Sequence, residues 1–179
     1  MRALAPILLA SLALPAPAQD LPVCGPAATI AHREGAPVDR VELRNISDGP
    51  WRIVTAVVDL GPSAGRLVFD TRPGGAGINT AQPFRPAGGE GVLAEMPEIP
   101  DGATVMTLAF SAFAPGAAFR FTIDLDDRLS GRGGTTIETA EAAGGVFTVT
   151  FAHEDGGTET HDGSFDAFGR ARAAAPCLS

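Results

Sequence analysis

Three carboxylates end a strand-like stretch and are the strongest candidates for chemistry in this chain. Asp124, Asp126 and Asp127 follow or interrupt a segment in which apolar and polar residues alternate from residue 117 onward. This period of two predicts a β-strand with one buried face. It also places Asp124 and Asp126 on the same face, about 7 Å apart. Calcium prefers oxygen ligands but takes about six to eight of them, so the segment alone predicts only part of a calcium site.

Two further aspartates are candidates to complete that site. Asp59 and Asp70 each stand at the end of a predicted strand, and the edges of a β-sandwich could bring them to the same place. The segment is not an EF-hand, because Arg128 and Leu129 occupy positions that require a ligand and a glycine. Two exposed charges about 7 Å apart repel by only about 0.6 kcal/mol in water. A solvated acidic strand end without a metal therefore stays open as the alternative to a calcium site.

Two other motifs suggest a hydrolase, and each has a simpler explanation. Gly61-Pro62-Ser63-Ala64-Gly65 matches the G-x-S-x-G pattern of α/β-hydrolases. Strand-like residues follow it and no helices alternate with the strands, so we expect Ser63 in a hairpin turn. His153 and His161 share a polar, glycine-rich segment without the H-E-x-x-H spacing. We expect no enzyme, and keep as an alternative a small secreted hydrolase that uses Ser63 or the His153/His161 loop.

The first residues have the pattern of an export signal. Met1-Arg2 gives a positive start, and the apolar run 3–14 is shorter than the roughly 20 residues of a membrane span. Ala16-Pro17-Ala18 is a small-x-small cleavage site. We therefore expect a signal peptide at residues 1–18 and a single domain at residues 19–179. No later apolar run approaches a membrane span, so the predicted location is extracytoplasmic, either secreted or periplasmic.

The chain has two cysteines, Cys24 and Cys177, which stand near its two ends. In an exported protein such a pair favours a disulfide bond over two free thiols. A loop of this length contributes on the order of 5 kcal/mol to stability in the chain-entropy description, less any strain. We expect this bond to hold both termini in place.

The balance of charge restricts the class of partner. The formal net charge is −8, all 13 basic residues are arginine, and there is no lysine or tyrosine. An acidic chain with scattered arginines is a poor nucleic-acid binder, and anionic lipid would repel it. Cations and neutral partners remain.

Most of the chain consists of short alternating segments separated by turns, and no stretch shows a long 3.6-residue period. Segment 86–100 is expected to be irregular, segment 153–163 to be a polar loop, and the end beyond residue 164 to be extended or irregular. The expected strands are 27–34, 38–46, 51–60, 66–71, 76–84, 106–110, 119–127, 135–141 and 147–151. Roughly eight to ten short strands predict an all-β, antiparallel β-sandwich that is jelly-roll-like.

Two runs in the middle of the chain are distinctive. They are Ser63-Ala64-Gly65-Arg66-Leu67-Val68-Phe69-Asp70-Thr71 and Phe121-Thr122-Ile123-Asp124-Leu125-Asp126-Asp127. With the sequence around them, over residues 38–128, they resemble a group of exported bacterial proteins called "aggregation factor core" proteins. That group is named for its similarity to a sponge cell-aggregation protein. The resemblance implies an extracellular β-sandwich and suggests adhesion, in the sponge case with calcium and carbohydrate, but it supplies no ligand residues.

The sequence hypothesis is therefore an exported, non-enzymatic adhesion or binding module of aggregation-factor type. Calcium is its candidate cofactor, at Asp124, Asp126 and Asp127 together with Asp70 and Asp59. The expected partners are an extracellular protein, a glycan or further copies of the chain, with no nucleic acid and no transmembrane segment. A structural envelope protein is the second alternative beside the hydrolase.

Overall fold

The computed structural model describes residues 22–35, 38–77, 81–127 and 137–177. The predicted signal peptide, residues 1–18, lies outside these ranges. The described residues form strands β1 to β11 and two short 3₁₀-helices, η1 and η2, and contain no α-helix.

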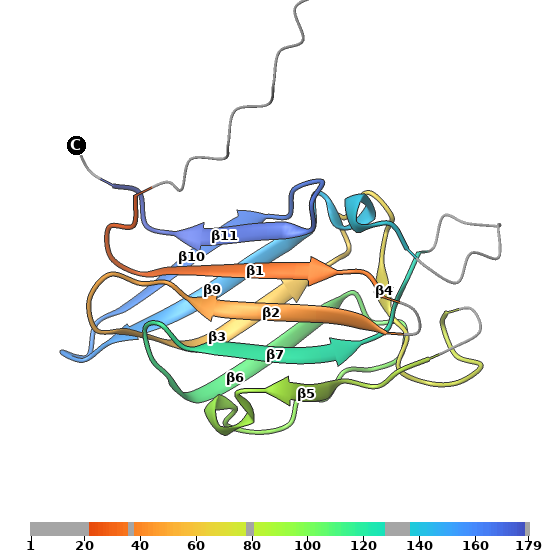
Figure 1. The fold of residues 1–179 in the computed structure, drawn as a ribbon, viewed down its shortest axis with the longest axis horizontal. Helices are drawn as coiled ribbons and strands as arrows, with labels where there is room; N and C mark the ends of the chain where they lie inside the picture. Colours follow the sequence, from red (N-terminus) through yellow and green to blue (C-terminus); the bar gives the residue numbers. More distant parts are fainter. Residues whose placement is uncertain (1–21, 36–37, 78–80, 128–136, 178–179) are drawn as a thin grey trace, which may run out of the picture.

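Two antiparallel sheets lie face to face, as Figure 1 shows. The first sheet has the order β11-β1-β2-β7-β5, with bounds Arg170–Ala174, Ala27–Arg33, Asp39–Asn45, Ala118–Ile123 and Arg85–Gly88. The second has the order β10-β9-β3-β6, with bounds Thr158–Ser164, Val146–His153, Trp51–Asp59 and Val105–Phe113. A two-stranded sheet pairs β4 (Val68–Phe69) with β8 (Leu125–Asp126). The all-β sandwich predicted from the sequence is confirmed.

The core fills the space between the two sheets. Alternate residues of β2 and β7 are buried, as a period of two requires of strands with one inward face. Large side chains that are almost completely buried include Ile30, Leu43, Phe119, Phe121, Ile53, Leu108, Phe147 and Phe151. Phenylalanine rings contact one another within β6, with centroids 4.8 Å apart for Phe110 and Phe113. They also contact one another across the layer, with centroids 5.7 Å apart for Phe110 of β6 and Phe119 of β7. Such ring pairs stabilise a core beyond the area that they bury.

Two segments expected to be irregular are edge strands. Residues 158–164 form β10, which pairs with β9 in a hairpin, where the sequence predicted a polar loop. Most of its side chains are exposed, because its sequence Thr-Glu-Thr-His-Asp-Gly-Ser contains no large apolar residue to bury. Arg85–Gly88 forms β5 at an edge of the five-stranded sheet, where Pro86 is tolerated because one side of an edge strand needs no ladder bonds.

Two predicted strands are wrong. Segment 76–84 forms no strand at its described residues 76–77 and 81–84, and segment 135–141 is the second. The described part of segment 135–141 contains the start of η2 (Thr139–Ala142), while residues 135–136 lie outside the described ranges. The backbone N–H of Glu138 donates to Oε2 of Glu141 at 2.6 Å, which forms a capping box that favours a helical turn over an extended strand. The other 3₁₀-helix, η1, covers Glu90–Val92.

The predicted strand 119–127 breaks at Asp124. Strand β7 ends at Ile123 in the first sheet, and β8 pairs with β4 instead. At the break, the N–H of Asp124 donates to the carbonyl oxygen of Gln82 at 3.1 Å, and its carbonyl accepts from the N–H of Asp70 at 3.0 Å. The chain therefore changes sheets at the point where its carboxylates begin.

Cys24 and Cys177 form a disulfide bond, with their Cα atoms 5.2 Å apart and 153 positions apart in sequence. The bond lies just before β1 and just after β11, which are neighbours in the first sheet. This confirms the predicted disulfide.

Replacing both Cys24 and Cys177 with alanine should lower the free energy of unfolding by about 4 kcal/mol, because the unfolded chain gains the freedom of a long loop. Urea denaturation followed by circular dichroism measures this change. Reduction of the wild type with dithiothreitol should give the same shift, and an unchanged urea midpoint after reduction would contradict the stabilising role.

Candidate metal centre

Asp70, Asp124 and Asp126 converge at one end of the sandwich. Each offers one carboxylate oxygen, and these three oxygens lie within 4.8 Å of one another. Asp70 directly follows β4, Asp124 lies between β7 and β8, and Asp126 ends β8. The structure thus brings together three of the five aspartates that the sequence analysis proposed as metal ligands.

The pairing of β4 with β8 explains this convergence. Val68 lies opposite Asp126 and Phe69 opposite Leu125, and the hydrogen bond from Asp70 to Asp124 continues this register. Directly opposite residues of an antiparallel pair have Cβ atoms about 5 Å apart. Because Val68, Phe69 and Leu125 are buried in or beside the core, the apolar residues hold the carboxylates in position.

The loop after β4 covers the cluster. A Cβ atom at Gly77 would overlap the Oδ2 atoms of both Asp70 and Asp126, so a larger residue at this position would displace these carboxylates. Asp101 anchors the same loop. Its Oδ1 accepts from the N–H of Thr71 at 3.0 Å, and its Oδ2 accepts from the N–H of Ala76 at 2.7 Å. The loop backbone therefore packs closely over two of the three carboxylates.

Burial and mutual repulsion leave the carboxylates of Asp70 and Asp124 poorly stabilised as anions. Burial raises the pKa of Asp124 to about 7, with further contributions from the charges of Asp126, Asp39 and Asp70. Burial also raises the pKa of Asp70 to about 6, helped by a hydrogen bond to the carboxylate of Asp101. Asp70 is only 2% exposed, and its Oδ1 has no hydrogen-bond partner among the described residues. A cation bound among these oxygens would remove the repulsion between the carboxylates. It would also supply the contact that Oδ1 of Asp70 lacks.

Asp39 positions the cluster, although the sequence analysis did not identify it. Its Oδ2 accepts from the N–H of Leu125 at 3.0 Å, and its Oδ1 lies 3.0 Å from Nε2 of His32. Both side chains are buried, so Asp39 fixes the residue between Asp124 and Asp126. The available signal was an acidic residue at an inward position of an otherwise alternating strand.

Asp59 and Asp127 do not belong to the converging group. Asp59 ends β3, where its Oδ1 accepts from the N–H of Gly61 at 2.8 Å and stabilises the turn. Asp127 directly follows β8. Although Asp127 is next to Asp126 in sequence, it does not join the cluster, because successive residues of an extended chain point to opposite sides.

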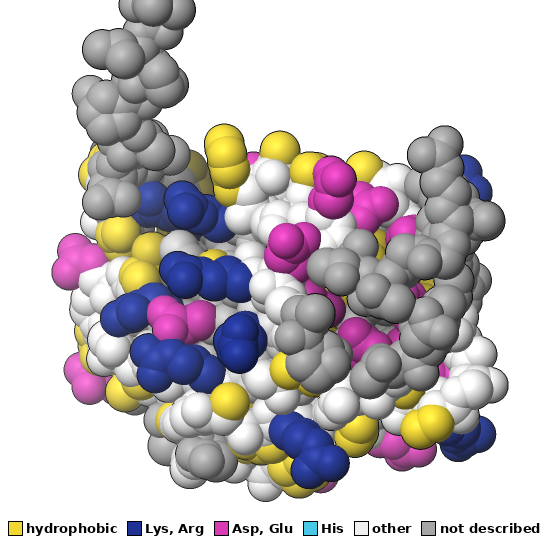
Figure 2. Space-filling model, turned by 45° about the vertical axis from the view of Figure 1, so that its right-hand side comes forward, with side chains coloured by type: hydrophobic (Ala, Val, Ile, Leu, Met, Phe, Trp, Pro, Cys, Tyr) yellow, Lys and Arg dark blue, Asp and Glu magenta, His cyan; other side chains and the backbone are white. Residues whose placement is uncertain are grey.

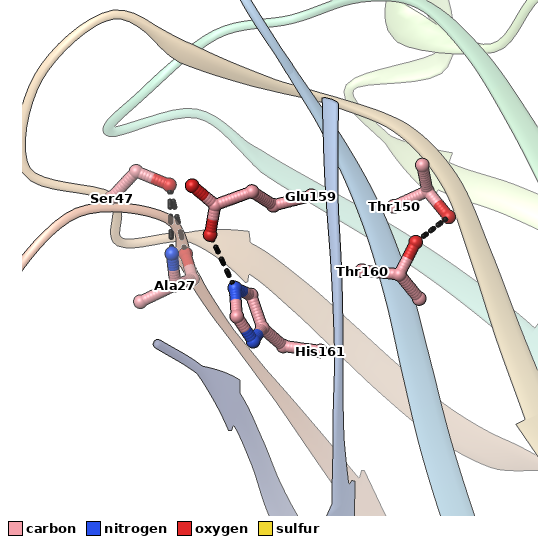
Figure 3. A network of polar contacts seen from close by, with 6 residues as sticks. All are labelled: Ala27, Ser47, Thr150, Glu159, Thr160 and His161. Atoms are coloured by element: carbon pink, nitrogen blue, oxygen red, sulfur yellow. Dashed lines mark hydrogen bonds and ion pairs between the residues drawn. The ribbon is translucent and has the colours of Figure 1, made fainter. Parts of the chain in front are cut away.

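The residues proposed for a hydrolase lie apart. Ser63 is buried in a turn, where its Oγ accepts from the N–H of Leu67 at 2.9 Å. His153 ends β9 and pairs with Asp155 at 2.8 Å, whereas His161 lies within β10 opposite Val149. His161 contacts Glu159 at 2.8 Å, as Figure 3 shows beside the Thr150–Thr160 and Ser47–Ala27 contacts. Within the described ranges, no histidine forms a hydrogen bond with Ser63.

Comparisons of the chain with protein-family models, with curated proteins and with solved structures find no match. Among the described residues, no helix has the length and apolarity needed to cross a membrane. The disulfide bond is compatible with an extracytoplasmic location, where disulfides persist.

Replacing Asp39 with alanine should lower the free energy of unfolding by about 3 kcal/mol, because it leaves His32 and the N–H of Leu125 buried without their partner. Asp39→Asn should cost less, since an amide oxygen still accepts from Leu125 and its NH₂ can donate to His32. Urea denaturation of both variants measures the difference. Equal losses for alanine and asparagine would argue against the hydrogen bonds as the cause.

The metal-free protein should lose stability as pH rises from 5 to 8. The folded-state pKa values of Asp70 and Asp124 are raised from 3.8 to about 6 and about 7, so the folded state binds more protons than the unfolded state between these values. Stability is therefore greatest below this window and falls as pH rises through it. Melting temperatures in the presence of a chelator measure the trend. Asp124→Asn should weaken it, and an identical pH profile for this variant would contradict the assignment.

Proposed function

We propose that this chain is an exported, non-enzymatic binding module of the adhesion type that binds calcium with Asp70, Asp124 and Asp126. The observation that carries the proposal is the convergence of these carboxylates within 4.8 Å. The buried, unpartnered Oδ1 of Asp70 adds to it, since an oxygen out of water needs a donor or a cation.

The chemistry of the group favours calcium among common metal ions. All ligands are carboxylate oxygens, and no histidine or cysteine belongs to the group, which disfavours zinc and other metals that prefer nitrogen or sulfur. Bidentate binding by several carboxylates approaches the roughly six to eight oxygens that calcium takes, with water completing the shell. Magnesium usually keeps several of its waters, and the close cover at Gly77 leaves little space for them on that side.

A bound calcium ion would join elements that are distant in sequence. It would link the end of β4 to the break between β7 and β8, beneath the loop that Asp101 anchors. Removing the repulsion among the carboxylates would stabilise the folded state by mass action. Such an ion would make one end of the sandwich rigid, which is what a binding surface requires.

Exported location and adhesion are supported by different observations. The disulfide bond and the signal-like N-terminal sequence favour an extracytoplasmic compartment. The resemblance to aggregation-factor proteins supports adhesion, with an extracellular protein, a glycan or a second copy as partner. The envelope-protein alternative has no specific observation in its favour.

Calorimetric titration of the metal-free protein with calcium chloride at pH 8 tests the cation. We expect one binding event, a higher melting temperature, and binding about tenfold weaker at pH 6, because protonation of Asp124 competes with the ion. Asp124→Asn and Gly77→Ala should both abolish most of the heat. Asp59→Asn is the matched control, since it removes a carboxylate outside the group. Absence of heat and of a melting shift at millimolar calcium would dismiss the site.

Coated beads test adhesion separately from calcium binding. Beads that carry the protein should aggregate in millimolar calcium and disperse in a chelator, whereas beads with Asp124→Asn should stay dispersed. Dispersed wild-type beads, together with normal calorimetric binding, would reject adhesion by this chain alone and leave the metal site standing.

A further inference from the structure

The outer face of the five-stranded sheet gathers more than half of the arginines in the chain. We call this surface the arginine face. It consists of the outward positions of β11, β1, β2, β7 and β5, and it includes Arg33, Arg40, Arg44, Arg85, Arg120, Arg170 and Arg172. Among the described outward positions of these strands, Glu42 is the only acidic residue. Figure 2 shows dark blue side chains grouped around a magenta one on the left, with other magenta side chains on the right.

Strand register arranges these arginines in rows across the sheet. Arg33 lies opposite Arg40, which lies opposite Thr122, which in turn lies opposite Arg85. A second row joins Arg170, Ala31, Glu42 and Arg120, and a third joins Arg172, Thr29 and Arg44. With strands about 4.8 Å apart, a row across five strands spans about 19 Å. The face is therefore an extended grid of cations separated by short side chains.

Four of these seven arginines have no acidic partner in the part of the chain that the structure describes. Glu42 pairs with Arg44 at 2.9 Å and also with Arg120. Among the described residues, Arg33, Arg40, Arg85 and Arg170 have no ion pair. Arg33 and Arg40 are directly opposite each other, an arrangement of like charges that destabilises a sheet. A destabilising arrangement of this kind points to a role outside folding.

This grouping corrects the expectation that the arginines are scattered. They are spread along the sequence, but alternation places them on one face, because every second residue of a strand points outward. A chain with a formal net charge of −8 therefore presents a strongly positive surface. Such a surface attracts anions at short range whatever the net charge of the molecule.

We propose that the arginine face binds a linear anionic polysaccharide through its sulfate or carboxylate groups. The guanidinium group forms paired hydrogen bonds to planar or tetrahedral anions. A hollow of about 410 Å³ on this face is lined by Arg33, Arg40, Glu42 and Arg120 among others, which provides space for one charged sugar unit. The rows extend beyond this hollow on both sides, as a chain of repeating anionic units requires.

Other anionic partners fit this face less well. Proteins that bind single-stranded nucleic acid use aromatic side chains on which bases stack, and no aromatic residue occupies a described outward position of these five strands. Proteins that lie on membranes insert large apolar side chains, whereas the short residues here include Thr29, Ala31 and Thr122. A second copy of the chain, with its acidic surfaces, is an outcome that the experiment separates.

This inference does not depend on calcium, because the arginine face and the Asp70–Asp124–Asp126 cluster use different residues. Biolayer interferometry of the full chain in a chelator tests the face with dextran sulfate, hyaluronate and neutral dextran as probes. We expect binding to dextran sulfate or hyaluronate, none to dextran, and weakening as salt rises. Preference between the two anionic probes identifies sulfate or carboxylate as the recognised group.

Three variants make the test specific. The triple variant Arg33→Gln, Arg40→Gln, Arg170→Gln should bind about tenfold more weakly, because each position loses a charge-assisted bond. The control Arg52→Gln, Arg66→Gln, Arg72→Gln removes three exposed arginines outside the face and should keep the wild-type affinity. Glu42→Gln should bind more tightly, because it removes the one anion and frees Arg44 and Arg120.

The opposite results would overturn the proposal. These are equal weakening by both triple variants, binding to neutral dextran as strong as to dextran sulfate, or stronger binding to a DNA oligonucleotide or to anionic phospholipid vesicles. Sedimentation that shows self-association of the wild type, lost in the Arg33/Arg40/Arg170 variant, would assign the face to a second copy. The Asp124→Asn variant should keep its affinity for dextran sulfate, which separates this result from any failure of the calcium site.

Discussion

Burial of one face of each sheet against the other is the constraint from which the remaining features follow. The layer between the sheets accepts phenylalanine, leucine, isoleucine and valine side chains, and a charge there would need a partner. Charged residues are therefore confined to outward positions and to the ends of strands. The arginine face and the carboxylate cluster are the two places where the sequence concentrates those residues, one on the flat side of a sheet and one at an end of the sandwich.

The carboxylate cluster exists because a strand leaves its sheet. A continuous strand through Asp124 would keep its side chain in line with β7, but the break lets β8 pair with β4 and places Asp70 opposite Asp124. Asp39 stabilises the break by accepting a hydrogen bond from the N–H of Leu125, a donor that would otherwise be buried without a partner. Gly77 and Asp101 then bring backbone over the carboxylates and limit their access to water. Because each of these contacts keeps water from the carboxylates, each increases the stabilisation of the folded state that a bound cation would give.

Much of the fold, but only part of the candidate site, could be predicted from the local sequence. Alternation located β1, β2, β3, β6, β7 and β9, and the cysteine pair was correct. Strand β10 was missed because an exposed edge strand has no apolar period. Asp70, Asp124 and Asp126 were proposed together, yet nothing local distinguished them from Asp59, since convergence depends on which strands pair. Asp39 was overlooked although its acidic side chain at an inward strand position was a local signal. The arginine face is visible only when neighbouring strands are in register.

The position of the Cys24–Cys177 bond has a mechanical consequence. Because it joins the residues just outside β1 and β11, both ends of the domain leave from one corner (Figure 1). A pulling force applied to the two ends would pass through the covalent bond and bypass the hydrogen bonds of every strand between them. The strands of the sandwich would therefore not be pulled apart. The fold would persist under forces, such as fluid shear, that unfold domains whose termini are pulled apart.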